Sequence, residues 1–220
     1  MQTIKKYRHG FWLAGFGLIY MLLFYYLEHR PIDEYHIIHT FLDDRIPFCE
    51  YFIVPYLLWF PYMFFAILYF IFRNNDKQEY YRLTKNLCMG MSLFLVISFL
   101  YPNGHHLRPI YFERDNIFVD LVKHLYQADT ATNILPSIHV FNSLAIHMAV
   151  YNCKSLEKYR WVRIGSLFLT ISIVLSTMFL KQHSVIDVCM GTGLALIGYV
   201  LFYREPAASR QSAAYVHRLR

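Results

Sequence analysis

The stretch from Ile164 to Tyr203, IGSLFLTISIVLSTMFLKQHSVIDVCMGTGLALIGYVLFY, decides the fold of this chain. Two apolar blocks lie on either side of the four residues KQHS. Each block approaches the roughly 20 residues that an α-helix needs to cross a hydrocarbon core of about 30 Å. The stretch therefore predicts two membrane-spanning helices joined by a tight turn that carries Lys181 and His183.

The same pattern continues through the rest of the 220 residues, of which 56% are hydrophobic. This composition excludes an ordinary soluble globule, and no repeat or linker divides the chain. Acidic and bulky residues follow the first block, so it is expected to be a retained span and not a signal peptide. The sequence predicts one all-α polytopic membrane domain over 1–220, with six spans at about 11–27, 52–72, 86–107, 135–150, 164–180 and 185–203.

Two predicted outer loops are long enough to carry short helices at the membrane surface. In the first, apolar residues from Ile37 to Leu42 share a helical face opposite acidic ones. In the third, between Arg114 and Gln127, apolar and charged residues alternate at helical spacing. Such amphipathic segments are typical of interfacial helices.

The basic residues predict the orientation of the domain. Of the 21 Lys and Arg residues, 15 fall at the N-terminus, in the second and fourth loops and in the tail 204–220. The positive-inside rule then makes both termini and this tail cytoplasmic. The small size and the spans favour a bacterial plasma membrane, with the opposite face extracytoplasmic. The net charge of +6 suits anionic lipid headgroups and requires no nucleic acid.

This orientation gathers polar residues at the outer face. Arg108 follows the third predicted span, His139 begins the fourth, and Lys181 and His183 lie between the fifth and sixth. A positive cluster at a membrane surface suits an anionic headgroup, most simply a lipid phosphate. The alternative is that Arg108 and Lys181 only extend to the headgroups while their stems stay in lipid.

The spacing His183-x3-Asp187 predicts two side chains on one face of the sixth span, one turn apart. A carboxylate there can accept a hydrogen bond from one imidazole nitrogen, which fixes the tautomer and leaves the other nitrogen free to react. The alternative is a polar pair that only stabilises the helix.

Pro136 and Ser137 begin the fourth span, where a proline fits the first helical turn. Free amides of that turn, together with the Ser137 hydroxyl, would form an anion site of the helix-terminus kind. His139 follows at once and is therefore a candidate catalytic residue.

Deeper in the spans, Asn142 and His147 are expected to make interhelical hydrogen bonds, and Gly191 and Gly193 to allow close helix packing. The four cysteines have unrelated spacings and predict neither a disulfide framework nor a metal site.

Three sequence pieces together resemble the type 2 phosphatidic acid phosphatase superfamily. They are Arg108-Pro109, Pro136-Ser137-Ile138-His139, and Ser176-Thr177-x5-His183-x3-Asp187. They occur in the family's order, from about the third span onward. The chain departs from the pattern in three places: Tyr101 replaces the first motif's lysine, Ile138 the second motif's glycine and Thr177 the third motif's arginine. The third piece also looks like that of inositol phosphorylceramide and sphingomyelin synthases.

The resemblance implies an enzyme that acts on a membrane lipid phosphate. His183 would attack phosphorus and form a phosphohistidine, Asp187 would orient it, and His139 would serve as acid and then base. The phosphoryl oxygens would be held by Arg108, Ser137 and Lys181. No metal or cofactor is implied. Water as acceptor would make a phosphatase, and a lipid alcohol would make a phosphotransferase.

Three other readings stay open. Ser137 and His183 could form the dyad of an intramembrane serine protease. His139, His147 and Asp187 could line the path of a transporter or channel. A zinc ion could bind His105, His106 and His183.

Overall fold

The computed structural model describes residues 2–204, with side chains from Gly10 onward. The basic N-terminal side chains and residues 205–220 of the predicted tail lie outside the described residues. The described part contains helices α1 Gln2–His29, α2 Phe41–Arg45, α3 Ile53–Phe72, α4 Lys77–Leu100, α5 Ile117–Ala128, α6 Ile138–Asn152, α7 Arg160–Phe179 and α8 Val185–Phe202, the 3-10 turns η1 Glu50–Phe52 and η2 Lys154–Leu156, and strands β1 His36–Ile37 and β2 Asn103–Gly104.

Five of these helical segments are long and apolar enough to cross a membrane. They are Gly10–His29, Glu50–Phe72, Lys77–Leu100, Arg160–Phe179 and Val185–Phe202. They fall on five of the six predicted spans. At the place of the remaining one, α6 has 15 residues, about 22 Å of helix. The chain therefore has the character of a multi-pass membrane protein, while six crossings and their orientation stay predictions.

The third predicted span has different ends in the structure. The α4 helix begins at Lys77, where the Asp76 side chain accepts a hydrogen bond from the backbone amide of Gln78 at 2.9 Å. It ends at Leu100, so the prediction that the span continues to residue 107 is wrong. Pro102 explains the early end, because a proline lacks the amide that a helix requires and disfavours helical geometry in the residue before it.

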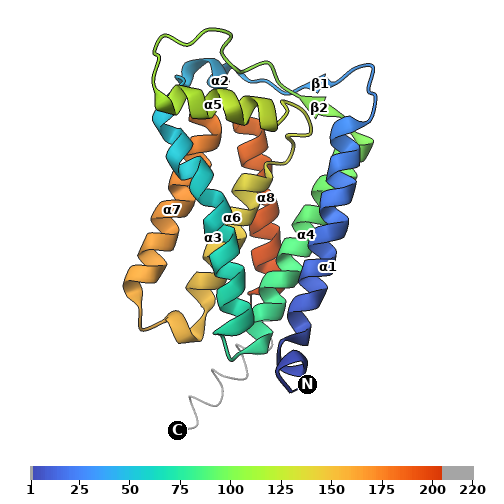
Figure 1. The fold of residues 1–220 in the computed structure, drawn as a ribbon, viewed down its shortest axis with the longest axis vertical. Coiled ribbons are helices and arrows are strands. Elements are labelled where there is room, and N and C mark those ends of the chain that lie inside the picture. Colours follow the sequence, from blue (N-terminus) through green and yellow to red (C-terminus); the bar gives the residue numbers. More distant parts are fainter. Residues whose placement is uncertain (1, 205–220) are drawn as a thin grey trace, which may run out of the picture.

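Helix α6 is the centre of the bundle, in contact with α3, α4, α7 and α8 (Figure 1). Two glycines make room for it. A Cβ atom at Gly90 would lie 2.0 Å from the Phe141 ring, and one at Gly191 would lie 2.7 Å from the Ser137 carbonyl oxygen. The packing role predicted for Gly191 is thus confirmed. Gly193 has no such contact, since a Cβ there would meet nothing within 4 Å.

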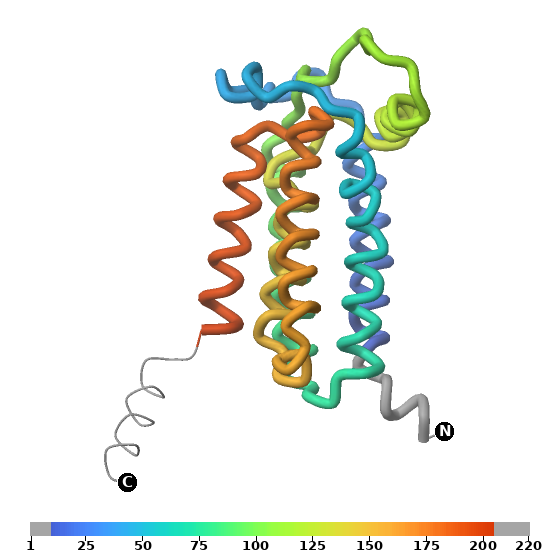
Figure 2. The backbone as a smooth tube through the Cα atoms, turned by 90° about the vertical axis from the view of Figure 1, so that its left-hand side faces the viewer, coloured from blue at the N-terminus to red at the C-terminus, as the bar shows by residue number. Residues whose placement is uncertain are grey.

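A layer of short elements covers one end of the bundle (Figure 1). There α5 lies across the helix ends, and β1 pairs in parallel with β2. The predicted helix between 114 and 127 is confirmed as α5. The helix predicted from Ile37 is wrong in extent: α2 covers only Phe41–Arg45, because the backbone at Ile37 pairs with Gly104. The turn between α3 and α4 and the end of α8 lie at the opposite end of the bundle (Figure 2).

Candidate active site

A pair of histidines lies directly beneath the covering layer. His139 is the second residue of α6, and His183 precedes Ser184, the N-cap residue of α8. The Nε2 atom of His183 lies 3.4 Å from the Nδ1 atom of His139. The two imidazoles, separated by 44 positions in the sequence, therefore form one unit that can share a proton.

Asp187 extends this unit on the other side of His183. Its Oδ2 atom lies 3.4 Å from the Nδ1 atom of His183, an ion-pair distance, and accepts a hydrogen bond from the Ser184 amide at 2.8 Å. Because α8 begins at Val185, His183 is not in the helix, and the prediction that both residues share a helical face is wrong. The N-terminal cap of α8 brings them together instead. The order Asp187, His183, His139 leaves the Nε2 edge of His183 facing His139.

The His139 ring lies among aromatic side chains of α3. Its centroid is 4.7 Å from that of Tyr56 and 4.6 Å from that of Trp59. Tyr56 is 1% exposed. Contacts on this side restrict the orientation of the His139 ring and keep its Nδ1 atom directed toward His183.

Both histidines line one cavity of about 420 Å³, called here the histidine cavity. One part of its wall is apolar and comes from α1, α3 and α4. The other part, beside the histidines, is polar. The apolar wall includes Gly17, Met21, Phe24, Trp59, Phe60, Met91 and Phe94, and the polar end includes Tyr56, Asp129, Thr130, Thr132, Asn133, Asn142 and Gln182. Its volume falls in the range of small-molecule sites.

Asp129 is a site residue that the sequence analysis missed. It follows the last residue of α5, and its carboxylate accepts a hydrogen bond from the Tyr56 hydroxyl at 3.2 Å. Burial raises the pKa of the Asp129 carboxyl, while the charges of His183 and Arg108 and the bond from Tyr56 act in the opposite direction. The only sequence signal was an acidic residue directly after an amphipathic helix at the same membrane face.

Gln182 is a second missed residue, and it connects Arg108 to the cavity. The Arg108 guanidinium donates to the Gln182 Oε1 atom at 2.5 Å and to the carbonyl oxygens of Tyr126 and Thr130 at 3.1 and 2.9 Å. The Gln182 Nε2 atom is buried without a hydrogen-bond partner among the described residues. Burial lowers the pKa of Arg108. The predicted phosphate ligand Arg108 is therefore one residue removed from the cavity wall.

The other two predicted phosphate ligands do not line the histidine cavity. Ser137 is fully buried, and its hydroxyl caps α6 by accepting from the Val140 amide at 3.4 Å. Pro136 precedes this cap, so the prediction that it occupies the first helical turn is wrong. The Lys181 ammonium points into the covering layer, where it donates to the carbonyl oxygens of Asp43 and Ile46 at 2.6 and 2.5 Å.

The His105 imidazole also contacts the site, but it bonds to a backbone group and not to a side chain of the cavity. Its Nδ1 atom accepts from the Leu107 amide at 3.1 Å, which leaves the proton on Nε2 to be donated to the Gln182 carbonyl oxygen at 2.9 Å. Burial, followed by the charges of His183 and Arg108, lowers the pKa of His105 to about 3. Within residues 2–204, no group of three His, Cys, Asp or Glu side chains could hold a metal ion.

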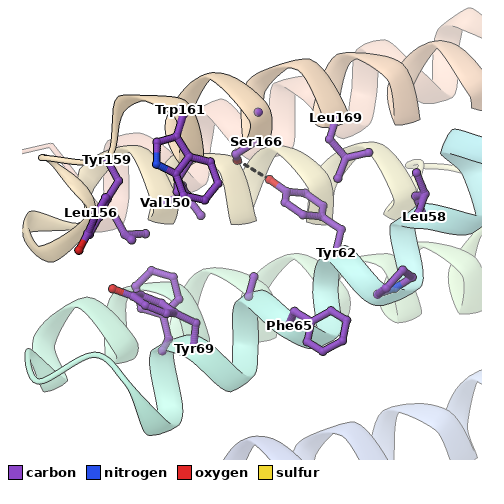
Figure 3. A pocket seen from close by; sticks show the side chains of 15 residues that line it. Leu58, Tyr62, Phe65, Tyr69, Val150, Leu156, Tyr159, Trp161, Ser166 and Leu169 are labelled. Atoms are coloured by element: carbon purple, nitrogen blue, oxygen red, sulfur yellow. Dashed lines mark hydrogen bonds between the residues drawn. The ribbon is translucent and has the colours of Figure 1, made fainter.

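A second, larger cavity of about 670 Å³ lies between α3 and α7 (Figure 3). Its walls are mostly apolar, and Tyr62 reaches across it to the Ser166 hydroxyl at 2.6 Å. The Nδ1 atom of His147 lies 3.0 Å from the same Ser166 oxygen. This contact confirms the interhelical hydrogen bond predicted for His147. Asn142 instead lines the histidine cavity, and its Oδ1 atom has no partner among the described residues.

Comparison with known proteins assigns no family to this chain. No family model, no curated protein and no solved structure matches it.

Proposed function

We propose that this protein is a membrane enzyme that cleaves or transfers the phosphoryl-containing headgroup of a lipid through a phosphohistidine on His183. The observation that carries the proposal is the series Asp187, His183 and His139 at the polar end of an otherwise apolar cavity. The apolar wall suits a lipid tail, and the imidazoles suit the phosphoester at its end.

The first chemical step uses the two histidines in different roles. The Nε2 atom of His183 attacks phosphorus while the Asp187 carboxylate stabilises the positive charge that develops on the ring. The phosphorus–oxygen ester bond breaks, and the leaving alkoxide takes a proton from His139. His139 is then neutral and can serve as a base in the second step.

The second step regenerates the enzyme. Water or an alcohol gives its proton to His139 while its oxygen attacks phosphorus, and the bond from phosphorus to His183 breaks. Gln182 is placed to assist in both steps. Because Arg108 occupies its Oε1 atom, the Nε2 atom, which lies beside the Tyr56 hydroxyl, can donate to a phosphoryl oxygen as charge builds up.

Trapping of the covalent intermediate tests this proposal. The purified protein is incubated with radiolabelled lipid monophosphates and diphosphates, quenched in alkali, and analysed for acid-labile label on the protein. We expect label on the wild type and on His106→Ala, a control at an exposed neighbouring imidazole, and none on His183→Ala. Equal labelling of His183→Ala, or neither label nor released phosphate in the wild type with any substrate, would contradict it.

A further inference from the structure

The polar end of the histidine cavity contains a carboxylate that the proposed phosphoryl transfer does not use. Next to the histidines lies the Asp129 carboxylate, which forms no ion pair with any described residue. Among the described residues that line this cavity, none is a lysine or an arginine. An anionic phosphoryl group is therefore disfavoured beside Asp129, whereas a neutral hydrogen-bond donor suits it.

The surroundings of Asp129 are held in place from outside the cavity. Glu28, near the end of α1, accepts hydrogen bonds from the Asn133 amide group at 2.6 Å and from the Thr130 hydroxyl. Thr130 also lies within hydrogen-bond distance of the Thr132 hydroxyl, at 2.8 Å. The segment after α5 thus presents hydroxyl and amide groups to the cavity on a fixed backbone.

Tyr56 connects this carboxylate to the histidine pair. Its ring packs on His139, and its hydroxyl donates a hydrogen bond to Asp129. One small molecule with two hydroxyl groups can therefore contact both Asp129 and His139 along this side of the cavity.

We propose that this end of the cavity binds an acceptor alcohol with two or more hydroxyl groups, one of which donates a hydrogen bond to Asp129. This inference rests on the function proposed above and names its second substrate. A second hydroxyl of the same molecule gives its proton to His139 and attacks the phosphohistidine. The new phosphorus–oxygen bond forms as the bond from phosphorus to His183 breaks, so the product is a phosphorylated polyol.

The amide nitrogen of Gln182, proposed above to donate to a phosphoryl oxygen, lies in the same cavity as Asp129. Gln182 is 3% exposed, and its Nε2 atom faces the Tyr56 hydroxyl without a hydrogen bond of normal geometry. An unpaired buried donor costs free energy unless a ligand satisfies it. Together with the acceptor oxygens of Asp129, it gives the cavity both kinds of partner that a polyol or its phosphate ester requires.

A partition experiment tests the inference on the unmodified protein. The wild type is charged with radiolabelled lipid phosphate in a buffer free of glycerol, and then either glycerol or propan-1-ol is added at the same concentration. The labelled products are separated into inorganic phosphate and the phosphorylated alcohol. We expect the ratio of phosphorylated alcohol to inorganic phosphate to be about tenfold higher with glycerol.

The variant Asp129→Asn tests whether the Asp129 carboxylate causes the preference for glycerol. It preserves the shape of the side chain and keeps an oxygen for the Tyr56 hydroxyl, but removes the charge. We expect phosphohistidine still to form, and the ratio of phosphorylated glycerol to phosphorylated propan-1-ol to fall about tenfold. The amount of phosphohistidine also reports whether the variant is folded.

The outcomes separate the two proposals. If the wild type forms no phosphohistidine, the proposed function fails. If phosphohistidine forms but glycerol and propan-1-ol partition equally, or only inorganic phosphate appears, the polyol assignment is overturned and the function stands. An unchanged glycerol preference in Asp129→Asn would overturn the role of that carboxylate.

Discussion

The buried carboxylate of Asp43 accepts a hydrogen bond from the Ser184 hydroxyl at 2.7 Å, although 141 positions separate the two residues. Its other oxygen accepts from the Val185 amide at 2.8 Å. Asp43, which lies in α2 of the covering layer, thereby fixes the first turn of α8. Since His183 lies directly before this turn, the covering layer fixes the position of the proposed nucleophile.

Replacement of Asp43 by alanine is expected to lower both stability and turnover. It leaves the Ser184 hydroxyl and the Val185 amide without their partner, a loss of about 1–3 kcal/mol. Thermal unfolding in detergent and phosphate release measure the two effects. Asp44→Ala is the matched control, because the neighbouring Asp44 side chain is 65% exposed and its carboxylate pairs with the exposed His39. Equal effects of the two variants would contradict this role.

Removal of His139 is expected to reduce cleavage of alkyl phosphoesters by about 10²–10⁴-fold, since the leaving alkoxide loses its proton donor. The effect should shrink with an aryl phosphate, whose leaving group is stable without a proton. Steady-state rates of His139→Ala on the two esters provide the comparison. His183→Ala is the contrast, because it should lose activity on both. A loss of the same size on both esters in His139→Ala would exclude the role of acid.

Acid is expected to destabilise the protein through His105. The folded-state pKa of about 3 lies below the unfolded value of 6.5, so between these two values the unfolded chain binds a proton that the folded chain excludes. The free energy of unfolding then falls as the pH falls, by at most about 1.4 kcal/mol per pH unit from this group.

Unfolding temperatures measured from pH 7 to pH 4 test this effect. We expect the slope to decrease in His105→Gln and to persist in His106→Gln, which changes an exposed neighbour. An identical slope in the wild type and His105→Gln would show that another group carries the acid sensitivity.

Gly191 and Gly193 form a matched pair for the packing of α8 on α6. A methyl group at Gly191 would meet the Ser137 backbone at 2.7 Å and displace the start of α6, whereas one at Gly193 meets nothing within 4 Å. Gly191→Ala is expected to cost about 1–3 kcal/mol and to lower activity, because His139 lies in the displaced turn. Gly193→Ala should leave both unchanged. Unfolding temperature and phosphate release, measured for both variants, test this difference.

Ser137→Ala distinguishes the phosphohistidine proposal from the serine protease reading. The hydroxyl caps α6, so its loss should cost about 0.5–2 kcal/mol of stability while phosphohistidine still forms. A fluorophosphonate probe should leave the wild-type Ser137 unlabelled. Covalent labelling at this residue would favour the protease.

The helices could be predicted closely because apolar blocks without charges leave few alternatives in a membrane. The predicted spans 52–72, 164–180 and 185–203 differ from α3, α7 and α8 by at most four residues at either end. The closeness of His139 and His183 also followed, since both were placed at the same face. The backbone pairing of β1 with β2 could not be predicted, because two-residue strands leave no periodic pattern.

The surroundings of the histidine pair were beyond sequence reasoning for a different reason. Asp43, Tyr56 and Asp129 act through contacts that join distant segments, and no spacing along the chain reveals such contacts. Lys181 illustrates the same limit. Its position in the turn indicated a phosphate ligand. Its backbone φ of 53° and its bonds to two carbonyl oxygens instead direct its side chain into the covering layer.

The contact between Trp59 and His139 makes the site optically observable. Trp59 is one of three tryptophans in the chain, and its ring centroid lies 4.6 Å from that of His139. A protonated imidazole at van der Waals distance quenches indole fluorescence, whereas a neutral one quenches it less. Each turnover of the proposed cycle changes the charge of His139, so Trp59 is an intrinsic reporter from which binding and proton transfer could be timed by stopped flow without a label.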